Sequence, residues 1–196
     1  MLSYYGENGI MKNFTREDQL FSLCGLNCGL CSMHLGGHCP GCGGGVGNQP
    51  CKIAKCSLEH GKIAYCNECD SFPCEKYPGE DEFDSFITYR NRYRDFEKLK
   101  KIGVKAYQKE QSEKVAILNE LLENYNDGRK KTLFCLAANL LELDDLRKVM
   151  EQIKEEGMGL SVKEKAAHIA GLLQEISDQK GICLKLRKKP AIGKEM

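Results

Sequence analysis

Apolar positions in the second half of the chain recur with the spacing of amphipathic helices. Residues 143–155 follow the i, i+3, i+4, i+7 pattern that places apolar side chains on one helix face, and that face would carry Leu146, Val149, Met150 and Ile153. The same spacing predicts further helices over residues 81–105, 112–125, 132–141 and 161–177. The last of these opens on SVKE at Ser161, a capping box. We therefore expect the chain beyond residue 78 to be mainly helical.

The first half of the chain predicts only short elements. TRED, from Thr15 to Asp18, is a second capping box and would open a helix toward Leu23. Short helices are also expected over residues 28–35 and 50–60, the latter with Pro50 at its first position. IAYC (residues 63–66) and the alternation of Ile182, Leu184 and Leu186 indicate two brief strands. The predicted fold class is mainly α, with a small irregular Cys-rich metal-binding module and few short strands.

A change of composition near residue 78 divides the chain. Upstream, GGHCPGCGGGVG and its surroundings hold few large apolar residues, so this segment cannot bury enough surface to fold alone. It needs closure by covalent or coordinate bonds. Three parts follow from this reasoning: an N-terminal arm with a short helix (residues 1–23), a Cys-rich metal-binding module (24–78), and a helical domain with a short C-terminal strand (79–196).

Charge and hydropathy exclude several classes of function. Lys and Arg number 29 and Asp and Glu number 28, so the net charge recruits neither nucleic acid nor a membrane surface. The chain has no apolar run long enough to span a bilayer, and its first residues, MLSYYGENGIMKNF, do not resemble a secretory signal. We expect a cytoplasmic protein, in a reducing compartment where disulfides are rare.

The cysteines dominate the candidate chemistry. Ten of the twelve fall in one stretch: Cys24, Cys28, Cys31, Cys39, Cys42, Cys51, Cys56, Cys66, Cys69 and Cys74. Three Cys-x2-Cys turns lie among them, and such turns deliver two thiolates to one tetrahedral zinc ion. We predict these ten residues to be metal ligands, with zinc (about two ions) as the cofactor. The interpretation that we prefer pairs Cys28/Cys31 with Cys39/Cys42, and Cys51/Cys56 with Cys66/Cys69.

The remaining donors of the module fit other roles. Cys24 and Cys74 could each displace a member of that pairing. His34, His38 and His60 also lie within the module, but a surplus of thiols makes capping or surface positions the better interpretation for them. Cys135 and Cys183 stand singly among aliphatic residues and are interpreted as small buried hydrophobic residues.

An iron–sulfur cluster is the alternative cofactor, because the same thiolates hold iron. The C-x3-C-x2-C spacing of CGLNCGLC occurs in radical S-adenosylmethionine enzymes, but seven more cysteines follow and the β/α units of that fold are missing. The ferredoxin run C-x2-C-x2-C-x3-C-P is absent as well. The alternative function is therefore electron transfer or redox sensing.

The cysteine motifs also carry a family resemblance. CGLNC, CPGC, C-x4-C, YCNEC and FPCEKY, over roughly residues 22–78, resemble the Cys-rich bacterial and archaeal family catalogued as domain of unknown function 3795. FCLAANLLELDDLRKVM resembles the helical extension of its longer members. The family is presumed to bind zinc and has no established activity, so the resemblance implies metal at the ten cysteines and no catalytic residue.

No other pattern outweighs its structural explanation. Basic residues recur every three or four positions from Arg90 to Lys105, which a solvated helix face explains. Glu142, Asp144 and Asp145 suit the first turn of a helix through its dipole. We therefore expect a zinc-binding protein whose metal is mainly structural, with an interaction or scaffold role. A protein partner is possible, nucleic acid is disfavoured because the module itself lacks Arg, and an enzyme is not indicated.

Overall fold

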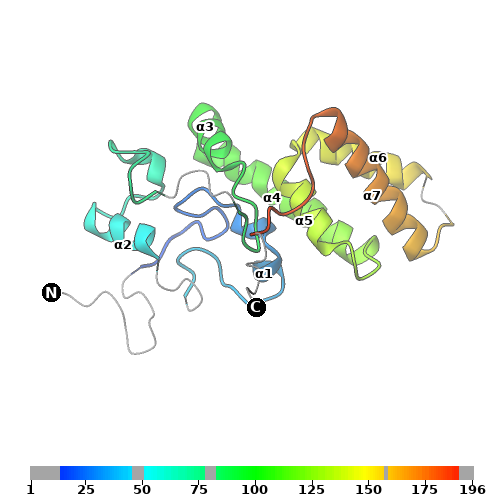
Figure 1. The fold of residues 1–196 in the computed structure, drawn as a ribbon, viewed down its shortest axis with the longest axis horizontal. Helices are drawn as coiled ribbons and strands as arrows, with labels where there is room; N and C mark the ends of the chain where they lie inside the picture. The colour runs from blue at the N-terminus through cyan, green and yellow to red at the C-terminus, as the bar shows by residue number, and fades with distance from the viewer. Residues whose placement is uncertain (1–13, 46–50, 78–82, 157–158, 190–196) are drawn as a thin grey trace, which may run out of the picture.

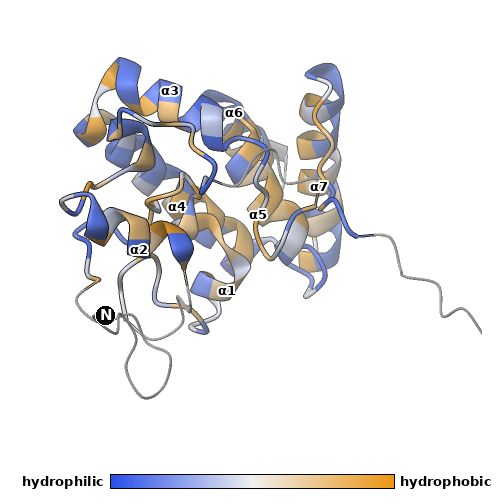
Figure 2. Ribbon diagram, turned by 60° about the vertical axis from the view of Figure 1, so that its left-hand side comes forward, coloured by the Kyte–Doolittle hydropathy of each residue, from blue (hydrophilic) through white to orange (hydrophobic). Residues whose placement is uncertain are grey.

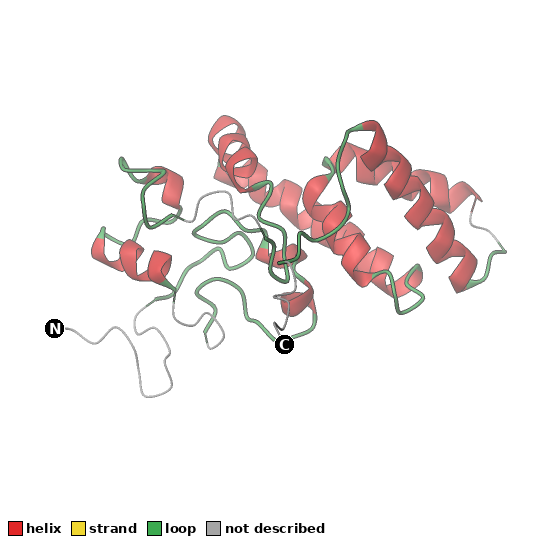
Figure 3. Ribbon diagram, in the orientation of Figure 1, coloured by secondary structure: helices red, strands yellow, loops and turns green. Residues whose placement is uncertain are grey.

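The computed structural model describes residues 14–45, 51–77, 83–156 and 159–189. The elements in these ranges are almost entirely helical (Figures 1 and 3), so the prediction of a mainly α fold with an irregular Cys-rich segment is confirmed. The α-helices are α1 (Ser32–Leu35), α2 (Lys52–Glu59), α3 (Arg92–Ile102), α4 (Val104–Asn124), α5 (Lys131–Leu140), α6 (Leu143–Glu156) and α7 (Val162–Gln179). Two 3-10 turns, η1 (Cys28–Leu30) and η2 (Cys66–Glu68), lie in the Cys-rich segment.

Helices α4 to α7 enclose the larger hydrophobic core, called here the main core. Its most deeply buried members include Leu118, Phe134, Leu141, Ile169 and Leu173, each with no exposed surface. The apolar face predicted for α6 is buried as well, from Leu146 to Ile153. Figure 2 shows that α5, in the middle of this group, is largely apolar. Local periodicity and tertiary burial agree here, which is why α5, α6 and α7 follow their predicted bounds closely.

Helix α7 begins at the predicted capping box. The Ser161 hydroxyl accepts a hydrogen bond from the Glu164 amide at 3.4 Å, and the Glu164 carboxylate accepts one from the Ser161 amide at 2.9 Å. These bonds satisfy amides that have no partner within the helix. The predicted helix start is thus confirmed.

A second, smaller core joins the Cys-rich segment to α3 and α4. We call it the aromatic cluster, and its buried members are Phe21, Leu23, Ile53, Tyr65, Tyr77, Phe96, Leu99 and Tyr107. The rings of Phe21 and Phe96 meet edge to face at 5.7 Å, an arrangement that aromatic quadrupoles favour. Figure 1 shows the Cys-rich segment (blue to cyan) beside these helices. The segment therefore shares a core with the helical part.

The helix predicted to run from Thr15 to Leu23 is not formed. Asp18 Oδ1 instead accepts hydrogen bonds from the amides of Leu20 at 3.1 Å and Phe21 at 2.9 Å. A carboxylate that bonds amides two and three residues ahead closes a turn and competes with the helix. The capping-box pattern was thus a turn signal, and the prediction was wrong.

The two predicted strands are also not formed. The only β pairing among the described residues is an isolated bridge between Phe21 and Asn27. Residues 182–186 run without a neighbouring strand, and the carbonyls of Cys183 and Lys185 accept hydrogen bonds from the Arg90 guanidinium at 2.6 and 3.0 Å. The predicted alternation nevertheless has its packing consequence, because Ile182, Leu184 and Leu186 contact the main core.

The long helix predicted over residues 81–105 is shorter than expected. Residues 83–91 form turns, and α3 starts at Arg92. The Asp84 carboxylate accepts from the Thr88 hydroxyl and the Tyr89 amide, which holds this stretch in a loop. Gly103 then separates α3 from α4, which begins eight residues before the predicted start at Ser112. Pro50, expected at the first position of α2, lies outside the described residues.

Candidate metal centre

The ten predicted ligands lie on turns and helix ends of the Cys-rich segment, and all ten are free thiols of intermediate exposure. Cys28 begins η1 and Cys31 is its C-cap, and Cys66 begins η2 and Cys69 is its C-cap. In both turns the amide of the second cysteine donates to the carbonyl of the first at 3.1 Å. Residues three apart share one side of a 3-10 turn. The two Cys-x2-Cys motifs are therefore shaped as paired sulfur donors.

A third turn carries Cys39 and Cys42, and a glycine makes it possible. Gly41 has φ of 92°, and a β-carbon there would lie 2.5 Å from the Gln19 carbonyl oxygen. The Cys42 amide donates to that same carbonyl at 3.0 Å. Only glycine permits both the positive φ and the close backbone approach. This turn thereby fixes Cys42 against the loop that precedes η1.

Four thiols form the first of two groups, defined by Cys28, Cys31, Cys39 and Cys42. Burial raises the pKa of the Cys28 thiol, and the neighbouring thiols of Cys42, Cys24, Cys31 and Cys39 raise it further. Like charges close together disfavour the ionised forms. Cys28 thus has as neighbours the three thiols that the sequence placed with it in one predicted site, together with Cys24.

The second thiol group is defined by Cys56, Cys66, Cys69 and Cys74, which line one cavity of about 30 Å³. Its other walls come from Lys76 and from the aromatic cluster and its surroundings, without carboxylate or imidazole. Burial raises the pKa of the Cys66 thiol, with Cys24, Cys74, Cys56 and Cys51 as further causes. Four cysteines, Cys56 of α2, Cys66 and Cys69 of η2 and Cys74 in the loop that follows, thus line one small cavity.

Two cysteines fall between these groups. Burial raises the pKa of the Cys24 thiol, and the neighbouring Cys51 thiol raises it further. The Cys24 thiol lies 3.3 Å from the Ser22 hydroxyl. Cys51 is the N-cap of α2, and its sulfur accepts from the Ala54 amide at 3.5 Å. Cys24 and Cys51 are accordingly the two thiols left over when each group has four members.

The ten thiols do not form a closed coordination shell in the described residues. Among the described residues, no group of three or more His, Cys, Asp or Glu side chains has the arrangement that holds a metal ion. The chemistry of the donor set, sulfur without competing oxygen or nitrogen ligands, nevertheless fits a thiophilic metal such as zinc or iron.

The three histidines of the segment occupy capping or surface positions, as interpreted from the sequence. His34 Nδ1 lies 2.9 Å from the Cys39 carbonyl oxygen, and His60 Nδ1 lies 2.8 Å from that of Cys56 at the end of α2. His38 is exposed. His60 Nδ1 also lies 3.6 Å from the Cys56 sulfur, while its shorter contact is the carbonyl.

The two cysteines outside the segment differ from each other. Cys135 is 6% exposed, as expected, and burial together with the nearby Cys31 raises the pKa of its thiol to about 11. Cys183 is exposed, so its interpretation as a buried residue was wrong. It alternates with Ile182 and Leu184, which take the inward positions.

Several of the basic and acidic positions after residue 90 form ion pairs. The Arg94 guanidinium lies 3.8 Å from the Glu142 carboxylate, and the Lys98 ammonium lies 2.8 Å from it. Asp145 lies 2.9 Å from the Lys180 ammonium. Ion pairs within the protein therefore account for Arg94, Lys98 and Glu142, and Asp145, which is only 8% exposed, also accepts from the Glu142 amide at the start of α6.

A buried polar network at the seam between η1, α3 and α4 was missed by sequence reasoning. The Asp95 carboxylate accepts from the side-chain amides of Asn27, at 2.7 Å, and of Asn91. The Tyr107 hydroxyl donates to Asn27 Oδ1 at 3.1 Å, and the buried Lys114 ammonium donates to the Leu141 carbonyl at 2.7 Å. No sequence signal links these residues, because up to 80 positions separate the bonded partners.

In comparisons with known proteins, no family model, no curated protein and no solved structure matches this chain. The resemblance to the Cys-rich family of unknown function therefore stays a prediction based on the cysteine motifs. Within the described residues, none of the helices has the length and apolar character needed to cross a membrane.

Proposed function

We propose that the Cys-rich segment, residues 24–77, is a zinc-binding module whose metal is structural. The observation that carries this proposal is the cavity of about 30 Å³ lined by Cys56, Cys66, Cys69 and Cys74. Four cysteines are the ligand set of closed structural zinc sites. This set includes Cys74 where the sequence favoured Cys51, because Cys51 caps α2 and does not line the cavity.

The donor set supports a thiophilic metal at the second thiol group, and a single zinc ion needs only the four thiolates that line this cavity. Four thiolates around one divalent cation carry a net charge of −2, and the Lys76 ammonium, 3.9 Å from the Cys56 sulfur, offsets part of it.

We propose the first thiol group as another zinc site. Cys28, Cys31, Cys39 and Cys42 come from η1 and from the turn fixed by Gly41. With both groups filled, the module holds about two zinc ions, and Cys24 and Cys51 remain thiols. The same arrangement agrees with the resemblance to the Cys-rich family presumed to bind zinc, and membership of that family is part of the proposal.

A structural role for the metal follows from the packing of the thiols against the aromatic cluster. Cys24, Cys42, Cys51, Cys66 and Cys74 contact the aromatic cluster, which also contains Phe96 of α3 and Tyr107 of α4. Metal bound at the two groups would hold the irregular segment against these helices. The module would then present a rigid surface for an interaction partner, in a scaffold role.

Metal analysis with cysteine variants tests this proposal. The full chain, purified without added metal and under anaerobic conditions, should contain about two zinc ions and little iron. Cys66→Ser should lose about one zinc, because Cys66 lines the cavity of the second thiol group. The matched control is Cys183→Ser, an exposed thiol outside the segment, which should lose none.

Two outcomes would overturn the proposal. Iron with acid-labile sulfide and broad absorption near roughly 400 nm would establish the iron–sulfur alternative. Zinc that survives both Cys66→Ser and Cys28→Ser would show that the two thiol groups are not the ligands.

A further inference from the structure

The chain after α7 lies across the main core as a strap, defined here as residues 182–187 (Figure 1, red). Ile182, Leu184 and Leu186 contact the main core, and Leu184 is only 5% exposed. The two residues between them are exposed. The strap forms no helix and no strand. Its alternate side chains and the contacts of its backbone therefore hold it in place.

Asp84 and Arg90, on the loop before α3, bind the backbone of the strap. The Arg90 guanidinium donates to the carbonyls of Cys183 at 2.6 Å and of Lys185 at 3.0 Å. The Asp84 carboxylate accepts from the Arg187 amide at 3.0 Å, and the Asp84 amide donates to the Arg187 carbonyl at 2.8 Å. Every second residue of the strap is thus held through its main chain. Main-chain hydrogen bonds, together with pockets for alternate side chains, are a common way to recognise a peptide segment.

One charged side chain adds specificity at the end of the strap. The Asp84 side chain has no exposed surface, and its carboxylate accepts from the Arg187 guanidinium at 2.9 Å. The Thr88 hydroxyl and the Tyr89 amide donate to the same carboxylate, so the loop fixes its position. A buried carboxylate that lost its arginine would be left with an uncompensated charge. We call the site formed by Asp84, Arg90 and the main-core surface under the strap the groove.

The strap does not fill the space beside it. A cavity of about 130 Å³ remains between α5, the loop of residues 85–88 and Leu186. One water molecule needs only about 10–15 Å³, so the cavity can take in several further side-chain atoms. Phe86, which lines it, is 65% exposed. A segment with a larger apolar residue in place of Leu186 would therefore gain apolar contacts that the strap lacks.

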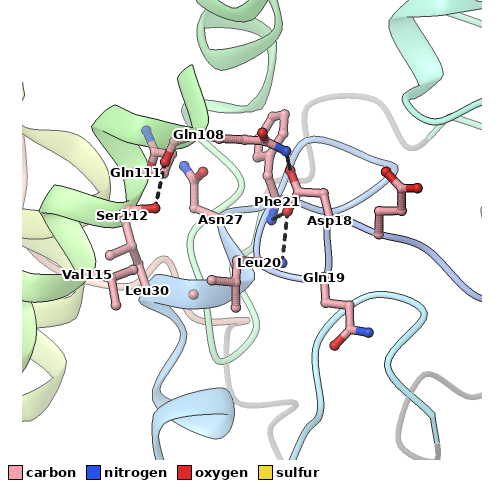
Figure 4. A pocket seen from close by; sticks show the side chains of 12 residues that line it. Asp18, Gln19, Leu20, Phe21, Asn27, Leu30, Gln108, Gln111, Ser112 and Val115 are labelled. Carbon is pink, nitrogen blue, oxygen red and sulfur yellow. Dashed lines mark hydrogen bonds between the residues drawn. The ribbon is translucent and has the colours of Figure 1, made fainter. Parts of the chain in front are cut away.

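Polar groups of a larger cavity, between the loop of residues 17–21 and α4, bond within the protein (Figure 4). The Asp18 carboxylate accepts from the Gln108 side-chain amide at 3.0 Å and from the Tyr65 hydroxyl at 2.8 Å. The Ser112 hydroxyl donates to the Gln108 carbonyl at 2.8 Å. The groove, in contrast, shows how a peptide segment is held.

We propose that the strap is an intramolecular substitute for a segment of a partner protein, and that the partner's segment displaces it from the groove. That segment has apolar residues at three alternate positions, the last of them larger than leucine and followed directly by arginine. A second copy of this chain would bring the same Leu186 and leave the cavity unfilled, so the partner is a different protein. This inference does not depend on zinc, because Asp84 and Arg90 lie outside residues 24–77.

A fluorescent peptide tests whether the groove accepts a segment from outside. It has the sequence of residues 181–189, with Cys183→Ser to avoid oxidation. The wild-type full chain should bind it weakly, because the tethered strap competes at a high effective concentration. Leu184→Ser in the protein removes the buried side chain of the strap and should raise the affinity for the peptide about tenfold or more. The matched control is Lys185→Ser, an exposed strap position, which should leave the affinity unchanged.

Changes in the peptide identify the contacts without altering the protein. In fluorescence anisotropy with the Leu184→Ser protein, a peptide that carries Leu186→Phe should bind about threefold tighter or more, because it enters the cavity. A peptide that carries Arg187→Ala should bind about tenfold more weakly, because it leaves Asp84 without its partner. A peptide of the same composition in scrambled order should not bind, which separates recognition from attraction by charge.

A second strap variant keeps the test independent of the main core. Arg187→Ala in the protein loosens the strap without removing a core side chain, and it should also raise the affinity for the unchanged peptide. The proposal would be overturned by equal affinity of wild type and both strap variants, or by equal binding of the scrambled peptide. A wild-type dimer in sedimentation that excess peptide dissociates would also overturn it, because the occupant would then be a second copy of this chain.

Discussion

Asp95 shows how a single buried carboxylate links the stability of the seam to pH. It is 5% exposed, and burial raises its pKa from 3.8 to about 6, although Lys114, Arg94 and the Asn27 amide act in the opposite direction and Glu142 raises it further. The folded state therefore binds this proton more tightly than the unfolded state. The resulting stabilisation is complete below about pH 3.8 and is lost as the pH rises through about 6.

The first prediction concerns Asp95→Asn. As the pH rises from about 4 to 7, wild type should lose up to about 3 kcal/mol of unfolding free energy through Asp95, and the variant should not. An asparagine Oδ1 can still accept from Asn27 and Asn91, so the local bonds survive. Urea unfolding of both proteins across this pH range measures the difference between their unfolding free energies. Both proteins carry the same cysteines, so the contribution of thiol titration cancels in this difference. A constant difference between them would contradict the assignment.

Arg92 is a buried cation held between two aromatic rings. It is 1% exposed, and its guanidinium carbon lies 5.0 Å from the Tyr77 ring centre and 4.9 Å from that of Tyr89. A planar guanidinium stacks on rings in a way that an ammonium cannot reproduce. Tyr77 belongs to the Cys-rich segment, so this stacking ties the segment to α3.

The second prediction is that Arg92→Lys lowers the unfolding free energy by about 1–3 kcal/mol, although the charge is kept. Chemical denaturation at fixed pH and metal content provides the measurement. Arg129→Lys is the control, because the Arg129 side chain is 74% exposed and pairs only locally with Asp127. Equal effects of the two substitutions would show that the ring contacts contribute little.

At the scale of elements, one glycine separates α3 from α4. Gly103 has φ of 83° and ψ of 157°, a region that is essentially restricted to glycine. A β-carbon there would meet no atom within 4 Å, so the restriction is conformational and not steric crowding. The break turns the chain so that α4 can contact both cores.

The third prediction compares two exposed glycines. Gly103→Ala should lower the unfolding free energy by about 1–3 kcal/mol, because alanine strains the backbone there. Gly171→Ala, inside α7 and equally free of contacts, should raise it by about 0.5–1 kcal/mol through helix propensity. Thermal unfolding of both variants reports the signs. Two changes of the same sign would contradict the role given to Gly103.

How far the sequence could predict each element depends on how local its causes are. Helices α5, α6 and α7 follow from periodicity and from the Ser161 cap, which act over a few residues. The loop before α3 depends on Asp84, whose carboxylate accepts from the Arg187 guanidinium 103 positions away at 2.9 Å. Such a contact leaves no local pattern, and the expected helix start was therefore wrong.

The candidate site likewise has features with local causes, which the sequence predicts, and features that depend on distant contacts, which it does not. Cysteine spacing identified the ten thiols, because Cys-x2-Cys turns are local structures. Replacement of Cys51 by Cys74 in the proposed second site required the cavity beside Tyr77. The polar network around Asp95 gave no signal, because its members meet only where η1, α3 and α4 pack together.

On the scale of the whole molecule, α4 contributes residues to two cores of different composition. Ile117, Leu118 and Leu121 of α4 belong to the main core, which α5, α6 and α7 complete with aliphatic residues. Tyr107, near the start of α4, belongs to the aromatic cluster, which otherwise depends on the irregular segment and α3. Loss of order in the segment should therefore leave most of the main core in place.

The fourth prediction is that metal removal unfolds only part of the molecule. A strong chelator should abolish the dispersed amide resonances of residues 24–77, because each structural zinc supplies on the order of 10–16 kcal/mol of apparent folding free energy. Amides of α5 to α7 should keep their dispersion and their protection from exchange. Two-dimensional amide NMR spectra before and after chelation measure both regions in one sample.

Re-addition of zinc after chelation distinguishes reversible unfolding of residues 24–77 from irreversible damage to the protein. Zinc should restore the resonances of residues 24–77, while magnesium should not, since it prefers oxygen ligands. An unchanged spectrum after chelation would mean that the aromatic cluster folds the segment without metal. Loss of both regions together would mean instead that the main core depends on the segment, through contacts such as that of Leu30 with the main core and the bond from Asn139 to the Leu30 carbonyl.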